Sequence, residues 1–210
     1  QDPYGIFNPF YRAERVLWKA IERFGIGRTR SDALKLIEQS LAAVQLRPAD
    51  VLGRYPHQLS GGQRQRVMLA RAHLLQPAFI VTDEPVSMLD AAVRVHFLNI
   101  LLDFLQQYGM STLFITHDLS NAFYVGGHLL VMSRGRIVER GAADAVMLHP
   151  AHPYTQLLLA SLPSPDPDVR WPDRMTETEQ TSAMADGGRE RCLFAERCAH
   201  VMARCWNEVP

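Results

Sequence analysis

Residues 78–118, AFIVTDEPVSMLDAAVRVHFLNILLDFLQQYGMSTLFITHD, hold two short apolar runs on either side of a longer amphipathic segment. The runs at 79–82 and 112–116 have the length and residue types of buried parallel strands. Between them, Asp90 predicts the cap of a helix over 91–108, which Gly109 ends. A strand, a helix and a second strand in this order predict an α/β fold with a parallel sheet at its centre.

The flanking sequence predicts further elements on both sides of this stretch. Spacing and capping residues predict helices at 12–24, 31–44 with Ser31 as cap, and 64–76, whereas 2–10 has the Pro, Gly and Asn content of a loop. Arg134-Gly135 lies between short apolar runs at 129–133 and 136–139, which is typical of a hairpin. Residues 163–190 are rich in Pro, Asp, Thr and Gly and are expected to be a linker.

Composition excludes several classes of protein. The chain has 210 residues, 47% of them hydrophobic and 21% charged, which is typical of a globular chain rather than a disordered one. Its 22 basic and 22 acidic residues balance, so the basic footprint of a nucleic-acid binder is absent. No apolar run approaches the roughly 18 residues that a membrane span needs. Three cysteines, all after Gly188, form no closed disulfide framework, which favours a reducing compartment such as the cytoplasm.

The lysines exclude one specific motif. Lys19 and Lys35 are the only two, and neither follows a glycine, so the sequence contains no Gly-x-x-x-x-Gly-Lys phosphate loop. The chain begins at Gln1 without a basic and apolar leader. We therefore expect a fragment rather than a natural start.

Two acidic residues and a histidine follow the predicted strands directly. Asp83 and Glu84 come at the carboxyl end of the first strand, where α/β sheets bind ligands, and they suit a Mg²⁺ ion and a reacting water, respectively. The alternative is a surface turn before Pro85. His117 comes at the same place after the second strand and can contact a terminal phosphate or the attacking water. Its alternative role is that of a histidine in a helix-capping loop.

A third motif precedes the helix predicted at 64–76. Ser60-Gly61-Gly62-Gln63 offers a hydroxyl, unobstructed backbone N–H groups and a helix dipole, which together suit a phosphate. An ordinary helix cap with a flexible entry is the alternative.

Together these motifs resemble, in order and spacing, the ATP-binding-cassette ATPases. The resemblance implies that Asp83 binds Mg²⁺, that Glu84 is the catalytic base, and that Ser60, Gly61, Gly62 and Gln63 form the signature motif. It further implies that Asp90 belongs to the D-loop, that His117 is the switch histidine and that Gln1 belongs to the glutamine loop. The family's phosphate loop and its adenine-stacking aromatic residue lie upstream of the glutamine loop, so this chain lacks them.

Further residues resemble the peptide and nickel importer branch of that family, notably Tyr55-Pro56-His57-Gln58, His152-Pro153-Tyr154-Thr155 with Leu157-Leu158, and the cysteine spacing. This resemblance implies ATP and Mg²⁺ as cofactors. The implied partners are a second ATP-binding subunit arranged head to tail, transmembrane permease subunits and, indirectly, an extracytoplasmic solute-binding protein. No nucleic acid is expected as a partner. The implied location is peripheral, on the cytoplasmic face of the membrane, and the implied task is to energise import of peptides or a similar small solute. Two alternatives are a soluble cassette ATPase in DNA repair or translation and a catalytically incomplete remnant.

The resemblance also suggests a division of the chain. The helical segment with the glutamine loop is expected at 1–58, the ATPase core at 59–162, the linker at 163–190 and a cysteine-bearing extension at 191–210. In some relatives this extension resembles a site for an iron–sulfur cluster, so Cys192, Cys198 and Cys205 are candidate ligands, with a fourth ligand downstream in the family pattern. A zinc site completed by His200 and three reduced thiols without metal are the alternatives.

Overall fold

A computed structural model describes residues 3–162 and 191–209. The chain divides into two compact units, residues 1–117 and residues 118–210. Gln1 and the predicted linker at 163–190 lie outside the described residues. No helix in the described ranges combines the length and the apolar character that a membrane crossing requires.

The elements of the first unit are α1 (Pro3–Ile6), α2 (Arg15–Phe24), α3 (Arg30–Ala43), α4 (Pro48–Val51), the 3-10 helix η1 (Pro56–Gln58), α5 (Gly61–Leu75), β1 (Phe79–Asp83), α6 (Ala91–Gln107) and β2 (Ser111–Ile115). Those of the second are α7 (Leu119–Val125), β3 (His128–Ser133), β4 (Arg136–Ala142), α8 (Ala143–Leu148), α9 (Pro153–Ala160), η2 (Ala195–Arg197) and η3 (Ala203–Trp206).

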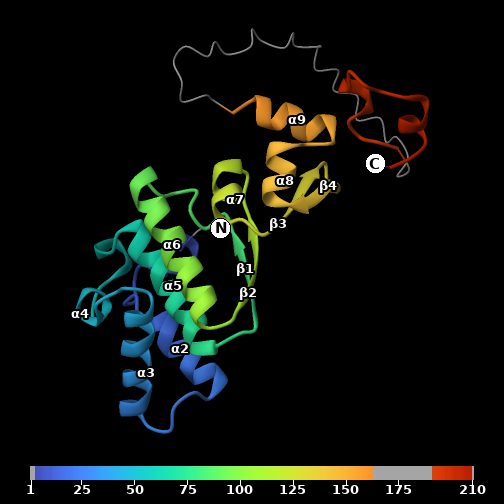
Figure 1. Cartoon of the computed structure of the whole chain (residues 1–210). Helices are drawn as coiled ribbons and strands as arrows, with labels where there is room; N and C mark the ends of the chain where they lie inside the picture. The colour runs from blue at the N-terminus through green and yellow to red at the C-terminus, as the bar shows by residue number, and fades with distance from the viewer. Residues whose placement is uncertain (1–2, 163–190, 210) are drawn as a thin grey trace. The chain divides into compact units, whose positions relative to one another are not determined.

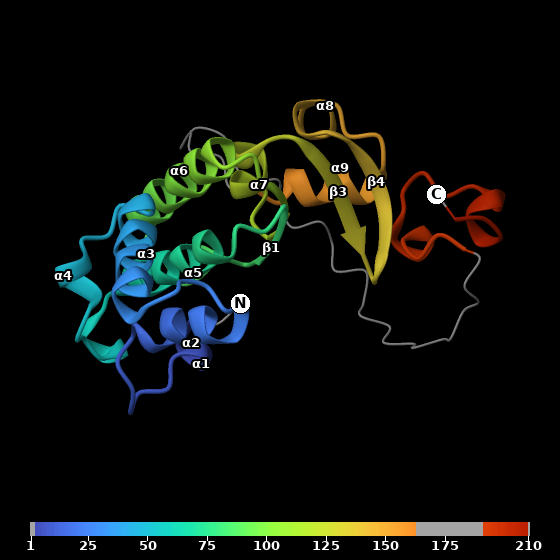
Figure 2. The same ribbon diagram turned by 90° about the horizontal axis from the view of Figure 1, so that it is seen from below.

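In the first unit, α5 packs against α2, α3 and α6 (Figures 1 and 2). Apolar residues at helical spacing fill the contact between these helices, and Leu17, Ile37, Leu41 and Val67 have no exposed surface. This packing explains why short helices of ordinary propensity are stable here, since burial of one face outweighs the cost of ordering the chain.

The expected parallel strands are confirmed, but they are not buried on both faces. β1 and β2 pair in parallel from Phe79↔Ser111 to Asp83↔Ile115 (Figure 1). The residues facing one side are mostly half-buried or buried, whereas Phe79 and Val81 on the other side are 55% and 57% exposed. The expectation of fully buried strands is therefore wrong for the described structure, because only one face of this strand pair is covered.

The helix starts differ from expectation at three places. Residues 3–6 form α1 where a loop was expected. The cap of α3 is Thr29 rather than Ser31, because Thr29 and Asp32 bond reciprocally to each other's backbone N–H. Helix α5 begins at Gly61, three residues earlier than expected, since Ser60 and Gln63 form the same reciprocal cap.

In the second unit, β3 and β4 form the expected antiparallel hairpin. Arg134 and Gly135 at its tip both have positive φ, 49° and 80°, as a tight two-residue hairpin turn requires. Helix α8 packs against β4, and His152 caps α9 by accepting the Tyr154 N–H at its Nδ1 (3.0 Å).

Candidate active site

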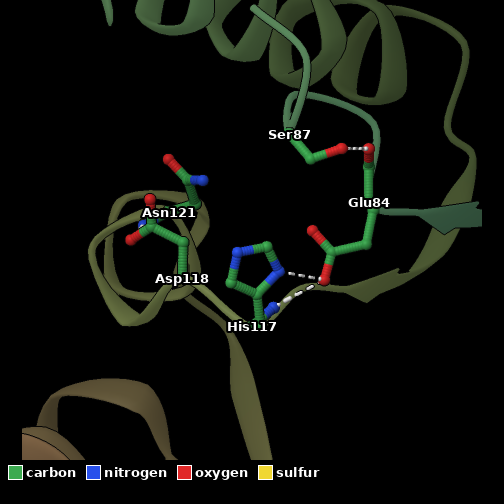
Figure 3. A network of polar contacts seen from close by, with 5 residues as sticks. All are labelled: Glu84, Ser87, His117, Asp118 and Asn121. Carbon is green, nitrogen blue, oxygen red and sulfur yellow. Dashed lines mark hydrogen bonds and ion pairs between the residues drawn. The ribbon is translucent and has the colours of Figure 1, made fainter.

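Glu84 and His117 meet at the carboxyl ends of β1 and β2 (Figure 3). Glu84 Oε1 accepts a hydrogen bond from the His117 backbone N–H (2.8 Å) and lies 2.6 Å from His117 Nδ1. An ionised carboxylate can only accept hydrogen bonds. With Glu84 ionised, the contact therefore needs the His117 tautomer that carries its proton on Nδ1 and donates a hydrogen bond to Glu84 Oε1. The Glu84 side chain is 13% exposed and that of His117 is 78% exposed, so the pair lies at the edge of solvent.

The backbone at Glu84 explains how the two groups come together. Its N–H donates to the Ile115 carbonyl (2.9 Å), which continues the parallel ladder one residue past β1. Its φ is +47°, a left-handed conformation that is uncommon for a residue with a Cβ and that often marks functional sites. The regular alternation of strand side chains therefore stops at Asp83.

Ser87 also holds this turn, a role that the sequence motifs did not indicate. Its hydroxyl donates to the Glu84 carbonyl (3.0 Å), as Figure 3 shows. A serine three residues after Glu84, with Pro85 between them, is the type of local turn signal that could have indicated this bond.

Asp83 and Asp90 are both exposed. Asp83 is the last residue of β1 and pairs in register with Ile115. Asp90 occupies the cap position of α6, but its side chain makes no capping hydrogen bond, which differs from the expected role. An exposed carboxylate at the end of a strand has the hard oxygen atoms that Mg²⁺ prefers, so Asp83 fits a magnesium ligand.

Ser60, Gly61, Gly62 and Gln63 form the first turn of α5 and its cap. Ser60 Oγ accepts the Gln63 N–H (3.2 Å), and the Ser60 N–H donates to Gln63 Oε1 (2.9 Å). The structure therefore shows the helix cap that was the alternative interpretation. A cap of this kind leaves the positive end of a fifteen-residue helix at the same place, so phosphate binding stays a prediction.

The cysteine-bearing extension packs on its own unit. Cys192 and Phe194 are each 8% exposed and contact Tyr154 and Leu157 of α9, together with Cys198 and Cys205. The Arg136 side chain donates to the Arg191 carbonyl (3.1 Å) and so joins the extension to β4. A host surface in the same unit therefore supplies the apolar contacts that so short a segment cannot provide alone.

The three cysteines do not form a metal site in this arrangement. No group of three or more His, Cys, Asp or Glu side chains among residues 3–162 and 191–209 is placed to hold a metal ion. His152 Nε2 lies 3.9 Å from Cys192 Sγ, but Nδ1 accepts the Tyr154 N–H, so a neutral ring carries its proton on Nε2 and offers no lone pair there. In the described geometry Cys192, Cys198 and Cys205 are free thiols that are not gathered around one centre.

Glu139 on β4 secures the start of α9. Its carboxylate accepts the Ala151 N–H (2.7 Å) and the His152 N–H (3.0 Å). Burial by itself raises the pKa of Glu139, but the hydrogen bonds that the carboxylate accepts outweigh this effect, and the pKa is lowered. Burial of the His152 ring lowers its pKa, against the opposing charge of Glu139.

A lowered carboxyl pKa predicts how this contact depends on pH. The stabilisation is complete well above the pKa of an unfolded glutamate, about 4.3, and is lost as pH falls through the lower folded value. We expect the protection of the Ala151 and His152 amides, measured relative to their intrinsic exchange rates, to fall at acid pH, and to be low already at neutral pH in Glu139→Gln. Hydrogen exchange by NMR measures both, with the exposed Glu208→Gln as control. A Glu139→Gln protein with unchanged protection would contradict the assignment.

Comparison with known proteins agrees with this fold. The ABC transporter family model matches residues 9–87, and the model for the oligopeptide/dipeptide transporter C-terminal region matches residues 138–205. Among solved structures, a dimeric ATP-binding cassette bound to ADP and Pi is 25% identical with a TM-score of 0.56, covering 65% of this chain and 59% of that one. The structure of cbiO1 from Clostridium perfringens, part of the ABC transporter complex cbiONQ, is 21% identical with a TM-score of 0.61, covering 70% of this chain and 57% of that one, and supports the fold alone. The chain therefore combines part of an ABC transporter ATPase domain with the oligopeptide/dipeptide transporter C-terminal region.

Its relatives come from the peptide branch. A Brucella ovis protein whose name describes a peptide import ATP-binding protein is 38% identical. The match covers 100% of this chain and 65% of that protein. The di/tripeptide transport ATP-binding protein DppF of Pseudomonas aeruginosa is 37% identical over 100% of this chain and 64% of its own length. The chain thus spans slightly less than two thirds of these relatives. The resemblance to the peptide importer branch is confirmed at the level of the family and of its C-terminal region.

Proposed function

We propose that this chain is part of an ATP-binding subunit that hydrolyses ATP to energise the import of peptides or a similar small solute. The main support for this proposal is the position of the Glu84 carboxylate at the carboxyl end of a parallel strand. Both the backbone N–H and the ring of His117 hold it there. The matching C-terminal region and the names of the relatives favour transport over a soluble cassette ATPase of DNA repair or translation.

The proposal assigns a role to each residue of the site. Glu84 takes the proton of the attacking water, which is the role of a general base within hydrogen-bond reach of its target. His117 orients the Glu84 carboxylate and, being 78% exposed, also faces the terminal phosphate of ATP. Asp83 holds Mg²⁺, which when bound neutralises charge on the phosphates. Gln1, outside the described residues, and Asp90 remain proposed nucleotide contacts.

The partners follow from the same proposal. A second ATP-binding subunit packs head to tail, so that Ser60, Gly61, Gly62 and Gln63 contact the phosphate bound by the other subunit. Permease subunits and, indirectly, an extracytoplasmic solute-binding protein complete the importer, and the subunit lies on the cytoplasmic face of the membrane. Cluster binding by Cys192, Cys198 and Cys205 stays a prediction from the resemblance, and no step of the function passes through it.

Peptide uptake tests the proposal directly. The whole subunit that the gene encodes is assembled with its permease in vesicles, and uptake of labelled di- and tripeptides is followed with and without Mg-ATP. We expect uptake that requires ATP and is lost in Glu84→Gln. ATP hydrolysis that nucleic acid stimulates and permease does not would instead support the soluble cassette ATPase.

The 210 residues alone are expected to show no ATP hydrolysis. Without a phosphate-loop lysine, nothing in this sequence holds the β- and γ-phosphates in line for attack. Steady-state phosphate release by the purified chain measures this. Sustained Mg²⁺-dependent release that disappears in Glu84→Gln would contradict it.

A further inference from the structure

Basic residues are concentrated in one short part of the first unit. Residues 10–30 hold six of the chain's 22 basic residues but only two of its 22 acidic ones, Glu14 and Glu22. Because the chain as a whole has no net charge, the rest of it has an equal excess of acidic residues. A local excess of positive charge of this size favours an anionic partner for this part of the molecule.

A cavity of about 800 Å³ lies in this region, between α2, the loop that follows it and the start of α3. Its volume is within the usual range of small-molecule sites, about 300–1,000 Å³. Two of its lining residues, Ile21 and Ala33, are buried, with 6% and 4% of their surface exposed. The loop turns tightly, since Gly27 has a φ of +85° and a Cβ on it would lie 3.3 Å from the Ala33 backbone nitrogen. Closely packed residues of both helices therefore form the base of the cavity.

The side chains around this cavity are mostly cationic. Four of them carry a positive charge: Arg12, Arg15, Lys19 and Arg30. Within residues 3–162 and 191–209, none of these four forms an ion pair with a carboxylate. Two acidic residues, Glu14 and Glu22, also line the cavity, and the Glu14 carboxylate accepts the backbone N–H of Gly53. Four cations against two carboxylates leave an excess of two positive charges.

Aromatic rings hold two of the guanidinium groups. The Arg15 guanidinium lies over the Tyr11 ring, 3.7 Å from its centroid, and the Arg30 guanidinium lies 5.7 Å from the centroid of the Trp18 ring. A guanidinium that is held against an aromatic face keeps its N–H donors at the edge of its plane. Arg15 in the first turn of α2 and Arg30 at the start of α3 thus offer partly oriented donors to the same cavity.

We propose that this cavity binds a phosphate-bearing anion, held by Arg15 and Arg30 with Lys19 as a third cation. A phosphate monoester carries about −1.5 to −2 charges at neutral pH, which matches the excess of positive charge better than a single carboxylate does. Its oxygens accept paired hydrogen bonds from a guanidinium group, and a lysine contacts phosphate as a point charge. None of these residues takes part in the proposed ATP hydrolysis, so the inference does not depend on the proposed function.

Binding is tested on the whole subunit with inorganic pyrophosphate as the probe. The NMR signal of the Trp18 indole N–H, assigned with Trp18→Phe, reports on this cavity rather than on the nucleotide site, and we expect it to shift saturably. Arg15→Gln combined with Arg30→Gln should weaken binding at least about 10-fold, because both changes remove charge-assisted hydrogen bonds. Arg23→Gln combined with Arg28→Gln is the matched control. It removes the same charge from exposed residues that do not line the cavity, and should change the affinity less than about 2-fold.

Two sources can supply this chemistry, a free phosphate ester and the headgroup of an anionic lipid. Sedimentation with phosphatidylglycerol vesicles, with phosphatidylcholine vesicles as control, distinguishes them. Cosedimentation that the Arg15 and Arg30 double variant loses, and that pyrophosphate competes away, assigns a lipid headgroup, whereas pyrophosphate binding without cosedimentation assigns a free phosphate ester. No saturable shift at Trp18, or equal loss of binding in both double variants, would overturn the proposal and favour an acidic protein segment as the partner of these cations.

Discussion

Replacing Glu84 by glutamine is expected to lower ATP hydrolysis by the whole subunit about 10²- to 10⁴-fold, the usual contribution of a general base. The amide keeps the size of the side chain. Its oxygen can still accept the hydrogen bond from the His117 backbone N–H, whose nitrogen lies 2.8 Å from Glu84 Oε1 in the wild-type protein. It cannot take a proton from water. ATP binding should therefore persist while turnover is lost, and phosphate release together with equilibrium nucleotide binding measures the two effects separately.

Asp103→Asn is the matched control, since it removes an exposed carboxylate from α6 in the same unit. It is expected to hydrolyse ATP at the wild-type rate. His117→Ala should give an intermediate loss, because the Glu84 carboxylate keeps its bond to the backbone N–H of residue 117 but loses the ring at 2.6 Å. Wild-type turnover in Glu84→Gln would show that another group is the base.

Replacing Phe104 by alanine is expected to lower the free energy of unfolding by about 3–5 kcal/mol, the range for truncating a buried phenylalanine. Phe104 is 1% exposed in the last turn of α6. Its ring lies 5.2 Å from that of Tyr108 and 6.1 Å from that of His73, measured between centroids. Truncation leaves a cavity beside the α5–α6 contact, which the surrounding aromatic groups can fill only in part.

Urea unfolding of the 210-residue chain, followed by circular dichroism, measures this loss. Phe24→Ala is the control in the same unit, because Phe24 is 63% exposed at the end of α2 and should change stability by only about 0.5 kcal/mol. Equal effects of the two substitutions would mean that α6 is not part of the cooperative core.

Local signals were sufficient for the strand–helix–strand order at 79–115 and for the hairpin at Arg134-Gly135. They worked because periodicity, helix caps and turn residues act over a few positions of the chain. The same signals misplaced the cap of α3, where Asp32 stabilises Thr29 rather than Ser31, and missed α1 altogether. At α3, both Thr29 and Ser31 are residue types that cap helices, and only the reciprocal bonds with Asp32 distinguish them.

The placement of Asp83, Glu84 and His117 at strand ends followed from the sequence, because carboxyl ends of parallel strands meet at one edge of a sheet. The contact between Glu84 and His117 did not follow from the sequence. It joins residues 33 positions apart and depends on the register of β1 with β2 and on the left-handed backbone at Glu84. The open face of that strand pair was equally beyond sequence reasoning. Sequence periodicity specifies which face of an element is apolar, but the partner that covers it, and how closely two backbones approach, depend on packing among residues distant in the chain.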